Sequence, residues 1–255
     1  MKFVKFLHKK KIKYGILNKD IVTEINGNYI DGQFDITKKK FKLNLLKLLP
    51  PVNPSKIVFL AYNYKDLVGE KKIYEEPLLG IKSNNSIIGI NDKIIINQKR
   101  KTWVEVELAI IIKKKCKNLN KKNALKHIFG YSIGNDVTMK NIHKRDHHLA
   151  RSKSHDTFCP LGPYIETEID TSNLIMHTYI DNKLYQKGNT SNRIYDDVEA
   201  MILASKYFTL LPGDVILTGT PANAEKSIIK HNSVVKLQIE GLGVLRNKVI
   251  LNEKK

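Results

Sequence analysis

The sequence predicts a β-rich α+β protein, because short strand-like runs follow one another along most of the chain and helical patterns are rare. The runs are rich in Val, Ile, Leu and Phe, and they are separated by Gly, Pro, Asn and Asp, which favour turns. Helical spacing of apolar residues is clear in the segments 121–129 and 197–208. We expect both helices to lie outside a β core.

The N-terminal part of the chain predicts a small β unit. Strand-like runs occupy residues 2–7, 13–17 and 21–25, and Asn26-Gly27-Asn28 predicts a hairpin turn after the third run. The proline-rich segment 49–54 cannot continue a helix or a central strand, so it predicts a linker. The expected domains are residues 1–53, a small N-terminal domain, and residues 55–255, a larger domain.

The larger domain carries clear local signals at both of its ends. It should begin with a buried strand at 56–61 and continue with a polar, helical stretch at 63–74. Gly130 would close the first of the two helices named above, and Asp196 would cap the second. The last segment, 234–251, predicts a hairpin.

Composition and charge restrict the class of protein. Apolar residues make up 42% of the chain and charged residues 27%, which is typical of a globular protein. The formal charge of +19 comes from lysines scattered along the chain rather than from one patch of arginines and aromatics. We therefore expect a solvated basic surface and a small-molecule partner, and not a nucleic-acid-binding protein.

The chain shows no sign of a membrane or secreted protein. It has no apolar run long enough to span a bilayer, and its first residues lack the apolar core of a signal peptide. We therefore expect a cytoplasmic protein. Cys116 and Cys159 are too few for a disulfide framework or a thiolate metal site, so we expect both to be reduced. We interpret Cys159 as a small buried residue rather than a nucleophile.

Two glutamates share one face of an expected strand. The period of two along a strand places Glu105 and Glu107 on the same side, roughly 7 Å apart at their Cα atoms. The same face continues with Ala109 and Ile111, and like charges beside an apolar surface are unfavourable unless a cation or hydrogen-bond donors neutralise them. A hard, oxygen-ligated cation would do so. The alternative is a half-exposed strand with both glutamates on its wet side.

A third carboxylate, Asp136, follows a strand-like run at 130–135. Taken alone it is a turn or capping residue as readily as a ligand. The number of residues between Asp136 and the glutamates does not determine how far apart they lie in space. Only the fold determines that distance.

Seven stretches of the sequence, in order, resemble the fumarylacetoacetate hydrolase family. They are 61–66 (AYNYKD), 104–109 (VEVELA), 130–137 (GYSIGNDV), 153–163 (KSHDTFCPLGP), 188–190 (GNT), 211–221 (LPGDVILTGTP) and 239–243 with 246–247 (IEGLG and RN). The N-terminal part resembles the small domain that many members carry. The resemblance implies a mixed β-sandwich or roll with a few outer helices, and a homodimer.

The resemblance also implies a metal site. Glu105, Glu107 and Asp136 would be the ligands, and Mg²⁺ is the expected ion, with Mn²⁺ or Ca²⁺ as alternatives. The metal would hold a small 2-oxo acid or acylpyruvate-like substrate and act on it as a Lewis acid. Lys153 and Thr220 would contact the substrate and take part in catalysis. The plain alternatives are one more surface lysine and an ordinary turn.

The implied reaction is hydrolysis of a C–C bond through a metal-stabilised enolate. Isomerisation, tautomerisation or decarboxylation of dienedioates from aromatic catabolism is the alternative within the same class. A catalytically inactive, family-like binding protein is the alternative of another class. Each of these hypotheses keeps the fold and differs in what the site does.

Two positions depart from the family pattern. Hydrolytic and decarboxylating relatives carry a His just after the position of Asp66 and a Glu three residues later, whereas this chain has Leu67 and keeps Glu70, our candidate catalytic carboxylate. Where some members have a Gln seven residues after the Asp, this chain has His143, which we expect to contact substrate. His143, Asp146, His147 and His148 do not fit the spacing of a zinc motif.

Overall fold

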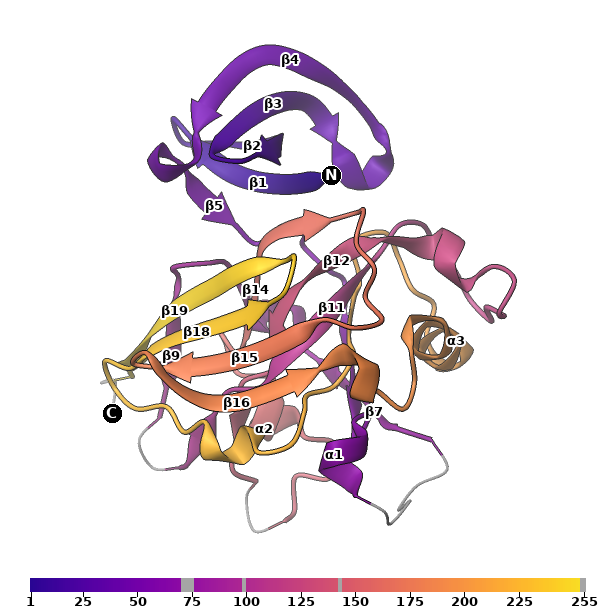
Figure 1. Cartoon of the computed structure of the whole chain (residues 1–255), viewed down its shortest axis with the longest axis vertical. Coiled ribbons are helices and arrows are strands. Elements are labelled where there is room, and N and C mark those ends of the chain that lie inside the picture. Colours follow the sequence, from indigo (N-terminus) through magenta and orange to yellow (C-terminus); the bar gives the residue numbers. More distant parts are fainter. Residues whose placement is uncertain (70–75, 98–99, 142–143, 253–255) are drawn as a thin grey trace.

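The computed structural model describes residues 1–69, 76–97, 100–141 and 144–252. Within them most regular structure is strand, and most strands belong to one large mixed sheet (Figure 1). Its order is β4-β3-β2-β1-β14-β12-β11-β17-β6-β7, with β5 beside β1 and β8 beside β14. The predicted β-rich α+β architecture is confirmed.

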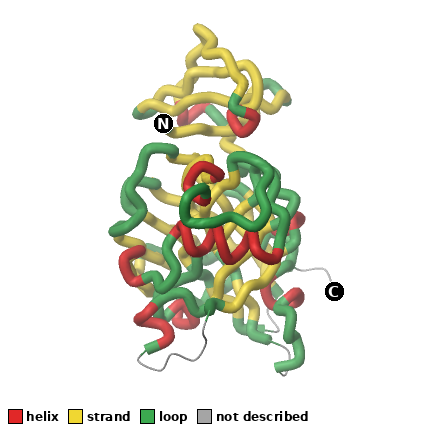
Figure 2. The backbone as a smooth tube through the Cα atoms, turned by 90° about the vertical axis from the view of Figure 1, so that its right-hand side faces the viewer, coloured by secondary structure: helices red, strands yellow, loops and turns green. Residues whose placement is uncertain are grey.

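The N-terminal strands form an antiparallel unit at one end of the molecule (Figures 1 and 2). They are β1 (Lys2–His8), β2 (Lys11–Asn18), β3 (Ile21–Asn28), β4 (Gln33–Lys42) and β5 (Lys47–Leu49). Strand β1 joins the following part of the chain, because Lys2 and Phe3 pair with Glu166 and Ile165 of β14 (Cys159–Glu166). The division into domains at residue 54 stays a prediction.

The remaining strands form the body of the molecule. Those of the large sheet are β6 (Ile57–Ala61), β7 (Leu78–Lys82), β8 (Ile87–Ile88), β11 (Val106–Ile112), β12 (Ile128–Asn135) and β17 (Val215–Leu217). A five-stranded sheet contains β9 (Lys93–Ile96), β15 (Ile175–Ile180), β16 (Lys183–Asn189), β18 (Val234–Ile239) and β19 (Gly243–Leu251). A short pair, β10 (Thr102–Trp103) and β13 (Thr138–Met139), completes the strands of the described part. The predicted first strand of this body and the predicted C-terminal hairpin are both confirmed.

Strand β11 is buried along its whole length, and its two faces belong to two different apolar clusters. Leu108 and Ile110 pack with residues of the five-stranded sheet, such as Leu237. Ala109 and Ile111 pack on the opposite side with residues that include some of the N-terminal unit. This alternation follows from the period of two along a strand. It places every second side chain of β11, from Glu107 onward, away from the cluster that joins the two sheets.

Three α-helices lie in the described residues: α1 (Lys65–Val68), α2 (Ala150–Lys153) and α3 (Asp197–Tyr207). Short 3₁₀ turns span Tyr29–Asp31, Leu43–Leu45, Asn84–Ser86, Ala124–His127, Thr190–Asn192 and Ala224–Lys226. No helix in this part of the chain is long and apolar enough to cross a bilayer.

The helix expected at 121–129 is wrong. This segment contains a turn and the 3₁₀ segment Ala124–His127, and β12 already begins at Ile128. The side chains of Asn120 and Asn123 accept hydrogen bonds from backbone N–H groups of the turn, which competes with helix formation. Of the apolar residues that suggested a helical period, Ile128 and Phe129 belong to β12, which pairs with β11.

Two further predictions need correction in length or position. The predicted hairpin turn at Asn26-Gly27-Asn28 lies inside β3, and the chain turns at Tyr29–Asp31, where the Asn28 side chain accepts a hydrogen bond from the N–H of Ile30. The helical stretch expected at 63–74 is in the structure the four-residue helix α1, which ends at Gly69. Residues 70–75 lie outside the described residues.

Helix α3 confirms the second predicted helix and its cap. The Asp196 carboxylate accepts a hydrogen bond from the N–H of Glu199 at 2.9 Å, and the Glu199 carboxylate accepts one from the N–H of Asp196 at 3.1 Å. This reciprocal capping box satisfies two N–H groups that the first turn of a helix leaves free. Met201 and Ala204 are fully buried on the inner face of the helix.

We predict that Asp196→Ala lowers the free energy of unfolding by about 1 kcal/mol, because the cap is lost and nothing replaces it. The melting temperature should fall by about 2–4 °C, as is usual for that energy in a chain of this size. Urea denaturation followed by circular dichroism measures the change. The control is Lys121→Ala in an exposed turn, which should change stability little; an equal loss in both variants would contradict the role of the cap.

Candidate functional site

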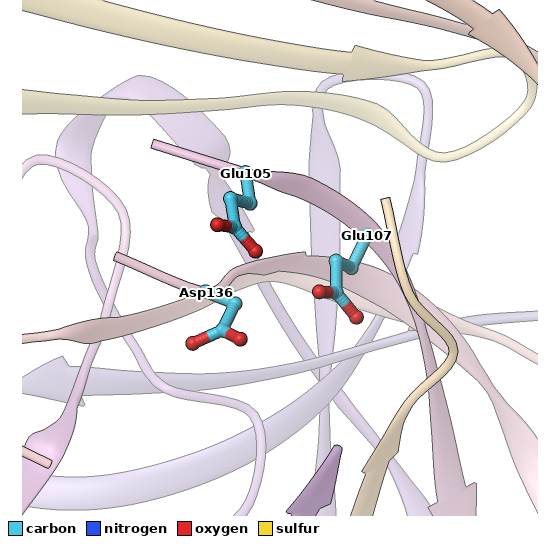
Figure 3. A group of neighbouring side chains, drawn as sticks. All are labelled: Glu105, Glu107 and Asp136. Atoms are coloured by element: carbon cyan, nitrogen blue, oxygen red, sulfur yellow. The ribbon is translucent and has the colours of Figure 1, made fainter. Parts of the chain in front are cut away.

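Three carboxylates meet where β11 and β12 run side by side (Figure 3). Glu107 lies opposite Gly134 in the antiparallel register, and the N–H of Asp136 donates to the carbonyl of Glu105 at 3.0 Å just beyond the paired ends. Directly opposite residues of such a pair have neighbouring side chains. One carboxylate oxygen of each of the three residues lies within 4.8 Å of the others. The structure thus brings together the three residues that the sequence proposed as ligands.

The carboxylates lie on a cavity of about 790 Å³. Apolar side chains on its wall include those of Phe59, Tyr62, Leu67, Leu78 and Leu149. Polar and charged side chains on its wall include those of Trp103, Thr138, Asn141, Lys144, Asp146, His147, Lys153, Thr220 and Glu225, besides the three carboxylates. A concave site that combines apolar side chains with convergent polar groups is typical of small-molecule binding, and the polar share is large here.

Each glutamate has a protein donor that fixes one of its oxygens. The Glu107 Oε2 atom accepts from the N–H of Gly219 at 2.6 Å, and the Glu105 Oε1 atom accepts from the indole N–H of Trp103 at 2.7 Å. Gly219 has a φ of +92°, and a Cβ there would lie 3.0 Å from Asn63 Cβ and from the Leu60 carbonyl oxygen, so only glycine suits this turn.

Two lysines hold the Asp136 carboxylate from opposite oxygens. Lys153, the last residue of α2, donates to Asp136 Oδ2, to Glu105 Oε2 at 3.2 Å and to Thr138 Oγ1 at 2.9 Å. Lys82, at the end of β7, donates to Asp136 Oδ1 at 2.6 Å. Both lysine side chains are buried. Lys153 is therefore not the surface lysine that the sequence left as an alternative.

Burial and charge act differently on the members of this group. Burial, and then the carboxylates of Asp136 and Glu105, raise the pKa of Glu107 well above its ordinary value. Burial would also raise the pKa of Asp136, but the ammonium groups of Lys153 and Lys82 outweigh it and lower that pKa. Burial would lower the pKa of Lys153, and the carboxylates of Asp136, Glu105 and Glu107 reverse this and raise it.

Thr220 lines the same cavity, as the sequence predicted. Its Oγ1 accepts a hydrogen bond from Gln186 Nε2 at 3.0 Å, and Gln186 also donates to the Pro221 carbonyl at 2.7 Å. Because the threonine oxygen acts there as acceptor, its own hydrogen is free to point to another partner. Thr220 can therefore donate to a ligand in the cavity.

Glu70 and His143, our candidate catalytic carboxylate and substrate contact, lie outside the described residues. Leu67 is described, and it lines the cavity at a position where the sequence departs from the expected family pattern. The zinc hypothesis gains no support from Asp146, whose Oδ2 accepts from the N–H and the hydroxyl of Ser152. In the described ranges, Glu105, Glu107 and Asp136 form the one cluster suited to a metal ion.

Both cysteines are free and buried, as the sequence suggested. Burial raises the pKa of the Cys159 thiol to about 12, so at neutral pH this residue is not a thiolate nucleophile.

The sequence did not point to Lys82, Trp103 or Gln186 as parts of the site. Trp103 is the sole tryptophan of the chain and lies two residues before Glu105, a signal that could have been used. Lys82 is one of many lysines and gives no signal of its own. Gln186 acts through Thr220, which only the packing of β16 against the turn at 218–221 reveals.

The donor set fits a hard divalent cation. Carboxylate oxygens are the ligands that Mg²⁺, Mn²⁺ and Ca²⁺ prefer. Three carboxylates so close together and so deeply buried repel one another, and a cation would relieve that repulsion. The observation that supports this is that Glu107 is buried with its carboxylate within 4.8 Å of the other two, surroundings that raise its pKa.

We predict that Glu107→Gln stabilises the metal-free protein at neutral pH. A carboxyl whose pKa is raised on folding contributes stability below its unfolded pKa and loses it as the pH rises toward the folded pKa. The variant lacks this loss, so its advantage in melting temperature over the wild type should grow from pH 5 to pH 8 in EDTA.

The matched control is Glu166→Gln. Burial would raise the pKa of Glu166, but hydrogen bonds and the positive N-terminus outweigh it and lower that pKa. Its ionised form therefore stabilises the fold above the unfolded pKa, and its replacement should destabilise the protein at neutral pH. If Glu107→Gln raised the melting temperature by the same amount at every pH, the raised pKa of Glu107 would not be its cause.

Comparison with known proteins identifies the family. The profile described as "Fumarylacetoacetate (FAA) hydrolase C-terminal" matches residues 56–250, and one described as "Rv2993c-like, N-terminal" matches residues 1–51. The structure of 2-hydroxyhepta-2,4-diene-1,7-dioate isomerase from Mycobacterium marinum superimposes with a TM-score of 0.91 at 32% identity, over 100% of both chains.

Two curated relatives carry other activities in their names. The mitochondrial oxaloacetate tautomerase of Xenopus laevis is 34% identical over 81% of this chain and 69% of its own length. The 2,4-didehydro-3-deoxy-L-rhamnonate hydrolase of Sphingomonas sp. is 34% identical over 79% of this chain and 75% of its own length. The relatives named here are thus an isomerase, a tautomerase and a hydrolase, and the chain belongs to the fumarylacetoacetate hydrolase family.

Proposed function

We propose that this protein is a divalent-metal-dependent enzyme that acts on a small 2-oxo acid, with Glu105, Glu107 and Asp136 as metal ligands. The observation that carries the proposal is the convergence of these carboxylates within 4.8 Å at a cavity of about 790 Å³. Mg²⁺ is the ion we propose, with Mn²⁺ or Ca²⁺ as alternatives. When bound, the ion would act as a Lewis acid that withdraws electrons from the 2-oxo group.

The residues around the carboxylates are suited to an anionic substrate. Lys144 and Lys153 line the cavity, and cationic groups at a partly enclosed site attract carboxylates. The longest of the three side-chain hydrogen bonds of Lys153 is the one to Glu105, at 3.2 Å, so a substrate oxygen could replace it at the least loss. Thr220 would donate its hydroxyl to the same substrate.

We further propose that the reaction is a proton shift on the 2-oxo acid, that is, a tautomerisation or isomerisation. Leu67 supports this, because a leucine on the cavity wall cannot accept a proton from water, as the His of hydrolytic relatives can. A proton shift moves one proton from carbon to a base on the cavity wall and returns one to the same molecule, so it consumes no water. The tautomerase and isomerase among the relatives are consistent with this proposal.

Hydrolysis of a C–C bond is the second candidate, and His147 favours it. His147 lies on the cavity wall and could take a proton from water in place of the missing His. A hydrolase is also among the relatives. A catalytically inactive scaffold is disfavoured, since such a protein has no need to keep three repelling carboxylates in a buried cluster.

We predict turnover of at least one member of a panel that contains oxaloacetate, acylpyruvates, fumarylacetoacetate and hydroxy-dienedioates. Turnover should require Mg²⁺ or Mn²⁺, stop in EDTA, and fall by more than about 100-fold in Asp136→Asn, since this change removes a charged ligand. The exposed Asp170→Asn variant is the control and should retain activity. Ultraviolet absorbance follows enol and keto forms, and chromatography of products detects cleavage.

The products decide between the candidates. A change of tautomer or double-bond position without loss of carbon atoms supports the proton shift. Release of two smaller acids supports hydrolysis and overturns the reaction that we propose. Metal binding without turnover of any substrate would favour the inactive scaffold.

A further inference from the structure

Lys82 lies behind the carboxylate cluster and has no access to solvent. Its side chain is 0% exposed, and its ammonium group donates to Asp136 Oδ1 at 2.6 Å, to the carbonyl oxygen of Val137 at 3.4 Å and to the carbonyl oxygen of Lys153. An ammonium group has three hydrogens, and three protein acceptors receive them. Lys82 is therefore fully engaged within the protein and cannot serve as a contact for substrate.

The partners of Lys82 belong to two separate parts of the site. Asp136 follows β12, and Lys153 is the last residue of α2. The ammonium group of Lys153 contacts Asp136 Oδ2 and Glu105. Lys82 thus joins the end of β7 to a carboxylate of the cluster and to the backbone of the lysine that enters the cluster. The contact of Oδ1 with Lys82 orients the carboxylate of Asp136 so that Oδ2 faces Lys153.

A second lysine–aspartate pair, between the partly exposed Lys56 and the buried Asp214, shows what a purely structural pair looks like. Lys56 donates to Oδ2 of the fully buried Asp214 at 2.6 Å and to the carbonyl oxygen of Thr209 at 3.0 Å. Asp214 also accepts hydrogen bonds from the backbone N–H groups of Ser55 and Leu211. This pair connects residues 55–56 with residues 209–214 through hydrogen bonds. Neither residue lines the cavity that contains the three carboxylates.

We propose that Lys82 is a positioning residue of the metal site: it orients Asp136 and fixes the start of the Lys153 side chain, and thereby sets the affinity for the divalent cation. The inference rests on the proposed function, since it takes Asp136 to be a ligand. Replacing a partner that orients a metal ligand from behind typically lowers metal affinity by about 10–100-fold.

The direction of the change separates positioning from simple charge. If Lys82 acted only as a nearby positive charge, its removal would strengthen cation binding, because like charges repel. If it orients Asp136, its removal weakens binding despite the lost repulsion. Lys82→Met removes both the charge and the hydrogen bonds at similar volume, and Lys82→Gln removes the charge but keeps a donor for Asp136.

The experiment measures the dissociation constants of Mn²⁺ by electron paramagnetic resonance and of Mg²⁺ by titration calorimetry on the purified, folded full-length chain. Lys82→Met should weaken binding by about 10–100-fold, and Lys82→Gln should weaken it less. Lys56→Met is the control: it breaks a lysine–aspartate pair elsewhere whose carboxylate is fully buried, so it should lower the melting temperature in EDTA and leave both dissociation constants unchanged.

The outcomes are distinct. If the wild type binds neither ion, the proposed function fails, and this inference fails with it. If the wild type binds and Lys82→Met binds equally or more tightly, only the inference on Lys82 is overturned. It is also overturned if neither Lys82 variant folds while Lys56→Met does, because the lysine would then serve the fold rather than the site.

Discussion

The pairing of β11 with β12 is the constraint on which the site depends. It places Glu107 opposite Gly134, and the hydrogen bond from the N–H of Asp136 to the Glu105 carbonyl extends the pairing beyond the strand ends. Gly134 matters in this register, because a Cβ there would lie 2.4 Å from a methyl group of Leu217. A shift of one residue would turn the glutamates toward the apolar cluster between the sheets, so burial of that cluster also fixes the register of the site.

The charge of the cluster follows from its burial. The three carboxylates outnumber the ammonium groups of Lys82 and Lys153, and solvent reaches little of this group. The lysines both contact Asp136, so most of the uncompensated repulsion remains at Glu107, whose pKa rises while that of Asp136 falls. A divalent cation placed among the three carboxylates would remove this imbalance, which is why the arrangement suits a metal better than further lysines would.

The predictions that depend on neighbouring residues in the sequence were correct, whereas strand pairing limited the others. The cap at Asp196 and the face shared by Glu105 and Glu107 depend on neighbours in the sequence, and the structure has both. The expected helix at 121–129 fails because its last apolar residues belong to β12, which pairs with β11, and because asparagine side chains accept hydrogen bonds from the backbone of the turn. Lys82 could not have been found in the same way, since nothing near it in a lysine-rich sequence indicates a contact with Asp136 across 54 residues.

The choice of reaction depends on different elements from those that hold the metal ligands. Glu105, Glu107 and Asp136 belong to or adjoin paired strands in a rigid sheet, whereas Leu67 lies in a four-residue helix and His147 in a loop before α2. Loops and short helices can change their side chains without disturbing a core, so one scaffold can keep its metal site and vary its acids and bases. Such a division between metal ligands and acid–base groups is consistent with the relatives, since a tautomerase and a hydrolase are equally similar to this chain. The reaction of this chain is therefore to be sought in the side chains that cover the cavity and not in the carboxylates at its floor.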